Sequence, residues 1–405
     1  MEWFNSFLAG YVKGINGWDV LVIARYFVGI VLMGRTDRYN YIVGTQTIGS
    51  KYQFTDKTRL LETAEIIHGM GSNILKFNMG SVFSKDNYAG PNPGNYKDLA
   101  DMAANEPSIY AVLGMPFYYY IIWANPLQKT EWQWRKTNDR LTDAEAEIEY
   151  RELYDLSCYL LKTYSGSGKS FYLGHWEGDW LLLAGYDRTK DPVPARVAET
   201  IKWLNIRQKA VDDARRDTPH HDVRLFHYTE VNLVQKGLRG SPCMTTDVLP
   251  HVNVDFVSYS AYDVAFDDAM PSALYEALDF IKKHLPEKEG LPDCRIFIGE
   301  FGYKGSEFAP VVQQQKSIQF AQRAVEWGCP FVLYWQLYDN EIVDGKYEGY
   351  WLIDNQGKKQ PLFYALEKYY SGARKYVAER LELDGQLPDQ KQFNKEAWSI
   401  LTQVK

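Results

Sequence analysis

Two glutamates in this sequence stand where carboxylates are costly. Glu177 lies between two tryptophans in the stretch SFYLGHWEGDW, and Glu300 follows an apolar run in the stretch CRIFIGEFGY. Because burying an unpaired carboxylate costs free energy, each side chain needs either a structural partner or a chemical role. A pair of carboxylates, one protonated and one ionised, is the arrangement that cleaves glycosidic bonds.

Short apolar segments rich in β-branched and aromatic residues alternate with helical patterns along the chain. Eight of them are predicted to be strands, at residues 41–49, 72–80, 116–126, 170–180, 222–234, 254–263, 294–303 and 330–341. Near-continuous apolar strands between helices indicate a parallel sheet that is covered on both faces. Eight such units predict an α/β fold, the closed (β/α)8 TIM barrel. No Gly-rich turn follows an early strand, as an open doubly wound sheet would require.

A single domain is expected, because no linker rich in Pro, Gly or Ser divides the chain. We predict an N-terminal extension packed on the barrel (1–40), the catalytic barrel (41–380) and a C-terminal helical tail (381–405). The apolar segment 19–35 is interrupted by Arg25 and is shorter than the ~20 residues that a membrane span needs. It also lacks the basic leader and the cleavage site of a signal peptide, so we expect it to pack against the main domain, with a membrane-associated segment as the alternative.

The composition narrows the range of partners. The formal charge of −7 argues against nucleic acid and anionic membranes, which both select a basic face. The aromatic fraction of 15% fits either a large aromatic core or a cleft for sugars. The four cysteines show neither a disulfide framework nor a zinc pattern, so no cofactor or metal is expected. A soluble protein is expected, either cytoplasmic or exported with its signal removed, and no oligomeric state is predicted.

Polar residues gather at the ends of the predicted strands, which form the active-site face of a (β/α)8 barrel. Glu177 and Glu300 end the fourth and seventh strands and are expected to face each other across the mouth. Apolar neighbours favour the protonated form of Glu177 by desolvation, which predicts a proton donor. The candidate substrate-binding residues at the strand ends are Lys76, Asn78, Trp123, His175, Trp176, Tyr228, Tyr259, Tyr262 and Trp335. The loop 84–98 is either a substrate-contacting lid or a long connection.

Three of these segments resemble clan A retaining glycoside hydrolases, a superfamily of (β/α)8 barrels. IFIGEFGY resembles the clan's seventh strand, FVLYWQLYDNE resembles its eighth, and YLGHWEGDW occupies the position of its fourth. The resemblance implies that Glu300 is the nucleophile, that Glu177 is the acid/base, and that Trp335 floors the sugar subsite. It extends from Tyr41 to about Tyr370 and is close only in the last three βα units.

The sequence departs from the clan pattern at two positions. The clan has Asn directly before its acid/base glutamate, where this chain has Trp176. The clan has Arg on strand two near the nucleophile, where this chain has Lys76, and lysine cannot make the same bidentate contact. A strand-six residue often hydrogen-bonds the nucleophile in the clan, and here either Tyr259 or Tyr262 is expected to do so.

Three hypotheses follow. The first is a retaining β-glycoside hydrolase that cleaves a poly- or oligosaccharide, with its two carboxylates ~5–5.5 Å apart. The second is a carbohydrate-binding barrel without catalytic activity, which the missing Asn–Glu pair favours. The third is a metal-dependent barrel hydrolase or isomerase that uses His175, Glu177 and Asp179.

Overall fold

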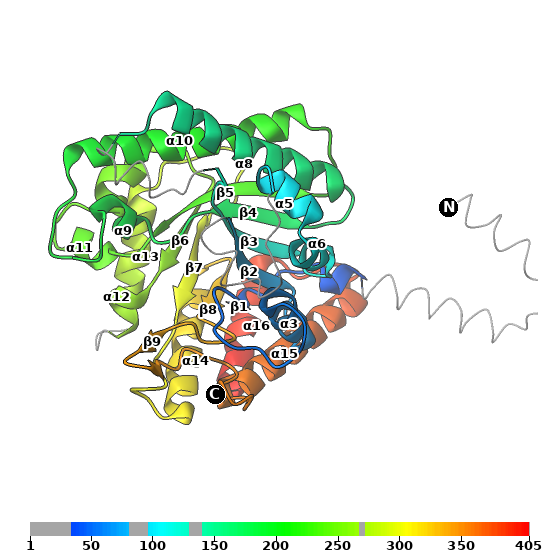
Figure 1. The fold of residues 1–405 in the computed structure, drawn as a ribbon. Helices are drawn as coiled ribbons and strands as arrows, with labels where there is room; N and C mark the ends of the chain where they lie inside the picture. The colour runs from blue at the N-terminus through cyan, green and yellow to red at the C-terminus, as the bar shows by residue number, and fades with distance from the viewer. Residues whose placement is uncertain (1–33, 81–95, 129–139, 267–271, 405) are drawn as a thin grey trace, which may run out of the picture.

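Eight parallel strands form a closed barrel in which each strand pairs with the next one along the chain (Figure 1). The computed structural model describes residues 34–80, 96–128, 140–266 and 272–404 of the 405-residue chain. The strands are β1 (Val43–Gln46), β2 (Ile74–Met79), β3 (Tyr119–Ala124), β4 (Ser170–Gly174), β5 (Arg224–Val231), β6 (Phe256–Ser260), β7 (Ile296–Phe301) and β8 (Val332–Tyr334). Each lies within the segment predicted for it, which confirms the (β/α)8 barrel.

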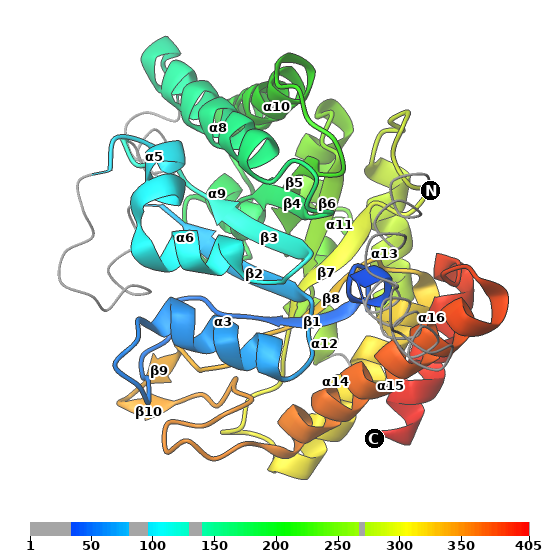
Figure 2. The ribbon, with the colours of Figure 1, turned by 90° about the vertical axis from the view of Figure 1, so that its right-hand side faces the viewer.

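Helices surround the barrel and connect its strands (Figure 2). They are α3 (Arg59–Gly69), α5 (Leu99–Asn105), α6 (Pro107–Gly114), α8 (Asp143–Thr163), α9 (Gly178–Leu183), α10 (Pro194–Asp217), α11 (Val234–Leu238), η1 (Met244–Val248), η2 (Leu249–His251), α12 (Tyr262–Ala265), α13 (Ser272–His284), α14 (Pro310–Trp327), α15 (Pro361–Asp384) and α16 (Gln390–Gln403). A small antiparallel pair, β9 (Ile342–Val343) and β10 (Lys346–Tyr347), follows β8.

Local sequence signals fix the ends of the longer helices. Thr142 and Glu145 form a capping box at the start of α8, where each side chain satisfies a main-chain N–H group. Pro310 opens α14, and Gly328 ends it at φ 106°, a left-handed conformation that glycine adopts without steric cost. These helices therefore begin and end where their residues favour it.

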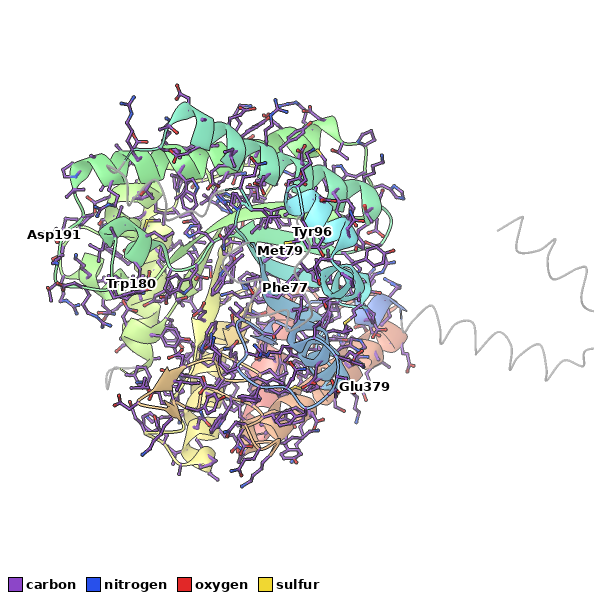
Figure 3. All side chains as sticks on the ribbon, in the orientation of Figure 1. Phe77, Met79, Tyr96, Trp180, Asp191 and Glu379 are labelled. Atoms are coloured by element: carbon purple, nitrogen blue, oxygen red, sulfur yellow. The ribbon has the colours of Figure 1, made fainter. Side chains whose placement is uncertain are left out.

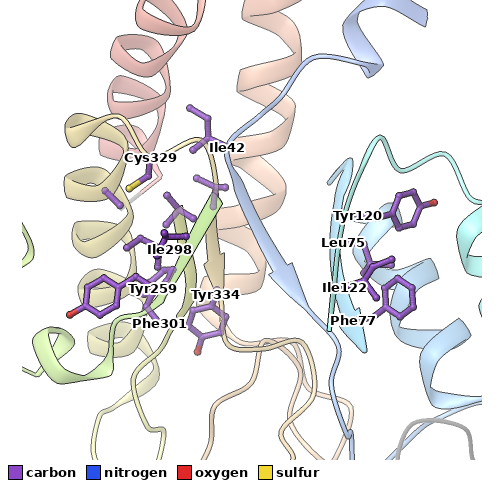
Figure 4. Packing of buried hydrophobic residues seen from close by; sticks show 14 of the residues in the cluster. Ile42, Leu75, Phe77, Tyr120, Ile122, Tyr259, Ile298, Phe301, Cys329 and Tyr334 are labelled. Carbon is purple, nitrogen blue, oxygen red and sulfur yellow. The ribbon is translucent and has the colours of Figure 1, made fainter. Parts of the chain in front are cut away.

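Strand alternation divides the core into two layers. One layer packs between strands and helices, and Figure 4 shows part of it, including Tyr259, Ile298 and Phe301. The other fills the inside of the barrel with side chains such as Tyr172 and Phe297. Burying a large apolar side chain stabilises a fold by about 1.5–3 kcal/mol. Both layers therefore hold the strand ends rigidly in place.

The regions outside the barrel are partly described. Residues 1–33, with most of the predicted extension, lie outside the described residues, as does most of the loop 84–98. Helix α15 runs from the barrel segment into the predicted tail, and α16 buries Phe393 and Leu401. The domain boundaries stay predictions. Among the helices of the described residues, none is long and apolar enough to cross a membrane.

Candidate active site

A cleft of about 780 Å³ opens at the C-terminal ends of the strands. Its lining includes both glutamates singled out from the sequence together with several aromatic rings. The lining residues are Ile48, Trp123, Trp176, Glu177, Trp180, Tyr186, Arg188, Asn232, Leu233, Ser260, Tyr262, Asp263, Phe266, Glu300, Trp335, Asn340, Glu341 and Tyr350.

A second cavity, of about 1050 Å³, lies at the opposite end of the barrel. Tyr119, Phe256 and Phe331, at or next to the first residues of their strands, line it with other apolar groups. Since barrel chemistry takes place at the C-terminal ends of the strands, the smaller cleft with its paired carboxylates is the candidate active site.

Glu177 follows β4 and immediately precedes α9. Its side chain is 7% exposed, and its Oε2 accepts a hydrogen bond of 2.5 Å from the indole Nε1 of Trp180, which Figure 3 labels. Burial raises the pKa of Glu177 well above its ordinary value, and the nearby charges of Glu300 and Glu230 raise it further. This environment favours the protonated acid.

Glu300 lies near the end of β7 and is 2% exposed. Its Oε1 accepts a hydrogen bond of 3.2 Å from the ammonium of Lys76, which reaches across from β2. Burial raises the pKa of Glu300 to about 8, although the positive charge of Lys76 opposes this rise. Glu300 therefore has a cationic partner, Lys76, that favours its ionised form. The partner of Glu177 is the neutral indole of Trp180.

An irregularity in β7 turns Glu300 toward the cleft. Ile298 and Phe301 both pack in the outer core layer, although they are three residues apart. Strict alternation would place them on opposite faces, and the strand register with β8 shifts between them. Glu300 would otherwise share the outward face of Ile298.

Lys76 is fully buried inside the barrel. Besides Glu300, its Nζ donates to the carbonyl oxygen of Gly299 at 3.0 Å and to Oε2 of Glu230 at 3.3 Å. The ammonium also lies 4.5 Å from the ring centroid of Trp123, within the range of a cation–π contact. A buried lysine is stable only with such partners, and two of them are carboxylates.

Glu230 is a site residue to which the sequence analysis gave no role. It lies on β5, is fully buried, and accepts hydrogen bonds from the Glu177 main-chain N–H at 3.0 Å and from Ser258 Oγ at 2.6 Å. Strand alternation could have predicted from the sequence that Glu230 faces the barrel interior. Phe226 and Tyr228 contribute to the inner apolar layer, and Glu230 continues that face.

Three tryptophans expected to bind substrate line the cleft together. The ring centroid of Trp123 lies 6.5 Å from that of Trp176 and 6.3 Å from that of Trp335. The indole Nε1 of Trp335 donates to Oε1 of Glu341 at 3.0 Å, and this bond fixes the orientation of the ring. Flat aromatic faces of this kind suit the apolar faces of sugar rings.

The structure separates the two strand-six tyrosines. Tyr262 lines the cleft, and its hydroxyl group is buried without a hydrogen-bond partner in the described part of the chain. Tyr259 lies in the outer core layer and donates to Asp263, so its expected place in the cleft is corrected. The reason is alternation, because Phe256 faces the barrel interior and Tyr259 is an odd number of residues away.

Four other expected substrate-binding residues do not line the cleft, and one of them is Lys76, which is fully buried. His175 is fully buried, with Nε2 at 2.8 Å from Thr229 Oγ1 and its ring against Trp203. Tyr228 packs inside the barrel against Gly174. Asn78 is fully buried on β2. Both faces of these strands are buried, so a polar residue near a strand end need not reach the mouth.

The three residues of the metal hypothesis point to separate partners. Asp179 accepts main-chain hydrogen bonds from Asn232, Leu233 and Met244, which holds it away from the cleft. Within the described ranges, no group of three or more His, Cys, Asp or Glu side chains could hold a metal ion. The geometry thus gives this hypothesis no ligand set.

The fold is shared with solved glycoside hydrolases. A GH5_18 structure from Streptomyces cattleya, a variant in complex with Manβ1-4GlcNAc, has a TM-score of 0.54 and 12% sequence identity. The match covers 86% of this chain and 82% of that one. The GH39 enzyme from Xanthomonas axonopodis pv. citri has a TM-score of 0.50 and 10% identity, over 83% of this chain and 67% of that one. No protein-family model and no curated protein matches the sequence.

The fold is the (β/α)8 barrel that these structures share, and the resemblance to clan A expected from the sequence is confirmed for the fold alone. Within it, Lys76 is the strand-two cation near Glu300, and it acts as a point charge rather than as a planar fork. Trp176, which precedes Glu177 in place of the clan's Asn, lines the cleft with its ring against Trp123.

Proposed function

We propose that the chain is a retaining β-glycoside hydrolase that cleaves a poly- or oligosaccharide by double displacement. The observation that supports this proposal is the pairing of Glu177 and Glu300 in one aromatic cleft with unlike partners. Lys76 stabilises the ionised form of Glu300. Burial beside a neutral indole favours the protonated form of Glu177.

In the first step a carboxylate oxygen of Glu300 attacks the anomeric carbon, and the bond from that carbon to the glycosidic oxygen breaks. The carboxylic acid of Glu177 gives its proton to the departing oxygen. The products of this step are a glycosyl ester on Glu300, an ionised Glu177 and a free alcohol. The newly formed negative charge on Glu177 arises as the charge on Glu300 disappears, so the net charge of the cleft is unchanged.

In the second step the ionised Glu177 takes a proton from water, and the resulting hydroxide attacks the anomeric carbon. The ester bond to Glu300 breaks and restores its carboxylate beside Lys76. Two inversions at one carbon give net retention of configuration. This mechanism requires carboxylate oxygens ~5–5.5 Å apart in the complex with substrate.

The aromatic side chains supply binding rather than chemistry. Trp123, Trp176 and Trp335 line one cleft and offer apolar faces to a sugar ring bound between the glutamates. Binding energy from these faces holds the anomeric carbon next to Glu300, which lowers the entropic part of the barrier.

The test is hydrolysis of a panel of β-glucans, mannans, xylans and galactans by the wild type and by Glu300→Gln, with products separated by chromatography. The expected result is cleavage of one polymer class by the wild type alone, with the β-configured product formed first in proton NMR spectra. An α-configured first product would exclude the double displacement. Equal activity of Glu300→Gln would remove Glu300 from the chemistry.

A second candidate is a carbohydrate-binding barrel without catalytic activity. Trp176 favours it, since the amide side chain that clan A enzymes place before the acid/base glutamate is replaced by an indole. Calorimetric binding to one glycan of the panel without turnover, unchanged in Glu300→Gln, would support this candidate against the hydrolase.

A further inference from the structure

Glu230 is a buried carboxylate next to both glutamates of the proposed mechanism, which gives it no function of its own. Glu230 is fully buried inside the barrel, beneath the cleft. Three donors from three different segments converge on it. They are the main-chain N–H of Glu177, the hydroxyl of Ser258 and the ammonium of Lys76, at 3.0, 2.6 and 3.3 Å. A carboxylate this well satisfied is fixed in position.

Hydrogen bonds connect the two carboxylate oxygens of Glu230 to the two glutamates of the proposed reaction, one directly and the other through Lys76. Oε1 accepts from the backbone of Glu177, which precedes α9. Oε2 accepts from Lys76, and the same ammonium donates to Oε1 of Glu300 on β7. One side chain on β5 thus connects residues from the fourth and seventh strand ends.

We propose that Glu230 is a positioning residue that holds the backbone of Glu177 and, through Lys76, the carboxylate of Glu300 in one fixed arrangement. The inference rests on the proposed function for the roles of the two glutamates. Glu230 itself is not among the residues that line the cleft, so it acts through its neighbours rather than on substrate.

Close packing restricts the movement of Glu230 and of its hydrogen-bond donors Lys76 and Ser258. A Cβ atom on Gly299 would lie 1.8 Å from Ser258 Oγ and 3.0 Å from Glu230 Oε2, so the strand of Glu300 packs directly against the bonded pair. Gln46 Nε2 and Lys76 Nζ both donate to the carbonyl of Gly299, at 3.2 and 3.0 Å. The position of Glu230 is therefore transmitted to β7 one residue before Glu300.

Glu230 also sets the charge that both glutamates experience. It shares the single ammonium of Lys76 with Glu300, and its own negative charge raises the pKa of both Glu177 and Glu300. Glu300, Glu230 and Lys76 act on the pKa of Glu177, and Lys76, Glu230 and Glu341 act on that of Glu300. Both glutamates in turn raise the pKa of Tyr262.

The test compares Glu230→Gln with Glu149→Gln. Glutamine keeps the shape of Glu230 and removes its charge, which leaves Lys76 to pair with Glu300 alone. Glu149, on helix α8 outside the barrel, is the matched control. It is also a buried carboxylate, and it pairs with Arg207 at 2.9 Å. The readout is the ionisation midpoint of Glu177 and Glu300, followed by NMR of protein with 13C-labelled glutamate carboxyls. Glu177→Gln and Glu300→Gln assign the two signals.

In Glu230→Gln both midpoints are expected to fall, that of Glu300 by about one pH unit, while Glu149→Gln leaves them in place. On the polymer that the wild type cleaves, kcat of Glu230→Gln is expected to fall at least 100-fold, with KM within threefold of wild type. Wild-type midpoints in folded Glu230→Gln would overturn the proposal. So would a kcat within threefold of wild type, or an equal shift in Glu149→Gln.

If Glu230→Gln does not fold, Glu230→Asp replaces it. Aspartate keeps the charge but is one methylene shorter, so it withdraws from Lys76 and leaves the ammonium to Glu300. The Glu300 midpoint is again expected to fall, and an unchanged midpoint would overturn the proposal. The NMR readout needs no substrate. A protein that shows the expected shifts and cleaves nothing would contradict the proposed hydrolase while supporting the positioning role of Glu230.

Discussion

Lys76 donates to Oε1 of Glu300 across the barrel interior, from β2 to β7, over 3.2 Å. Both side chains are almost fully excluded from solvent, so the charge of Lys76 strongly affects the ionisation of Glu300. The carboxylate of Glu300 is therefore ionised more easily than its burial alone would allow. A carboxylate nucleophile must be ionised at a pH where the general acid is still protonated.

Lys76→Met is expected to raise the pKa of Glu300, because burial then acts without the opposing ammonium. A higher pKa means that Glu300 is protonated, and inactive as a nucleophile, over a wider acidic range. The acidic limb of the kcat/KM profile should move to higher pH by about 1–3 units. Loss of one partner of a buried ion pair should also cost about 3–5 kcal/mol of unfolding free energy.

The measurements for this variant are pH–rate profiles together with urea unfolding. Lys359→Met is the control, since Lys359 makes an exposed pair with Glu367 at 3.9 Å. This control should keep the wild-type profile and stability. An acidic limb that stays in place in Lys76→Met would show that the ammonium does not govern the ionisation of Glu300.

Glu177→Gln is expected to slow cleavage of sugar leaving groups by about 10²–10⁴-fold, because these alcohols leave only with a proton. A dinitrophenyl leaving group needs no proton, so its departure should be slowed far less. The measurement is kcat/KM for matched aryl and disaccharide substrates of the sugar that the wild type accepts. Equal losses on both leaving groups would contradict the role of Glu177 as general acid.

The sequence predicted the barrel and its catalytic face because the strands are long apolar segments at regular intervals. It also predicted that Glu177, Glu300 and three tryptophans would meet, since the carboxyl ends of barrel strands share one face. The cleft contains all five of these residues. Sequence patterns therefore predict well those site residues whose location depends only on their position at a strand end.

Side-chain direction was harder to predict, because parallel strands are apolar on both faces. Nothing in VDFVSYSAYD distinguishes an outward Tyr259 from an inward one before the strand register is known. The inward turn of Glu300 depends on the irregularity of β7, which the local sequence does not announce. The inward direction of Glu230 could have been predicted, since it lies two residues after Tyr228 on the same strand face. Its role depends on Lys76, which is distant in sequence.

Tyr262→Phe is expected to lower kcat/KM by about 10- to 100-fold, the loss of one hydrogen bond to a charged group. Tyr262 lines the cleft, and its hydroxyl is buried and unpartnered among the described residues. The charge of Glu300 and burial both raise its pKa, so it stays a neutral donor through the working range. Kinetics of the variant on the accepted substrate measure this effect.

Tyr259→Phe is the matched control for this prediction. It removes a hydroxyl of the outer core layer, which donates to Asp263 at the edge of the cleft, and is expected to cost about 1–3 kcal/mol of unfolding free energy. Its kcat/KM should stay within threefold of wild type. If Tyr259→Phe loses activity and Tyr262→Phe does not, the assignment of the two tyrosines is reversed.

Gly299→Ala is expected to disrupt the site, because no space exists for a methyl group there. The added Cβ would lie 1.8 Å from Ser258 Oγ, far inside van der Waals contact, on the residue directly before Glu300. Relief requires either rotation of the Ser258 hydroxyl away from Glu230 or a shift of β6 or β7, with a cost of about 1–3 kcal/mol or more in unfolding free energy. Thermal unfolding and kcat measure the two effects.

The double variant Gly299→Ala/Ser258→Ala removes the hydroxyl that causes the closest contact and leaves Ser258 Cβ at 3.2 Å from the added methyl group. It should recover part of the stability that Gly299→Ala loses, with an interaction energy of about 0.5–3 kcal/mol in a double-mutant cycle. Additive losses would mean that the two strands do not pack as closely as this contact requires. Recovery of stability without recovery of kcat would show that the hydrogen bond from Ser258 to Glu230 matters for catalysis beyond folding.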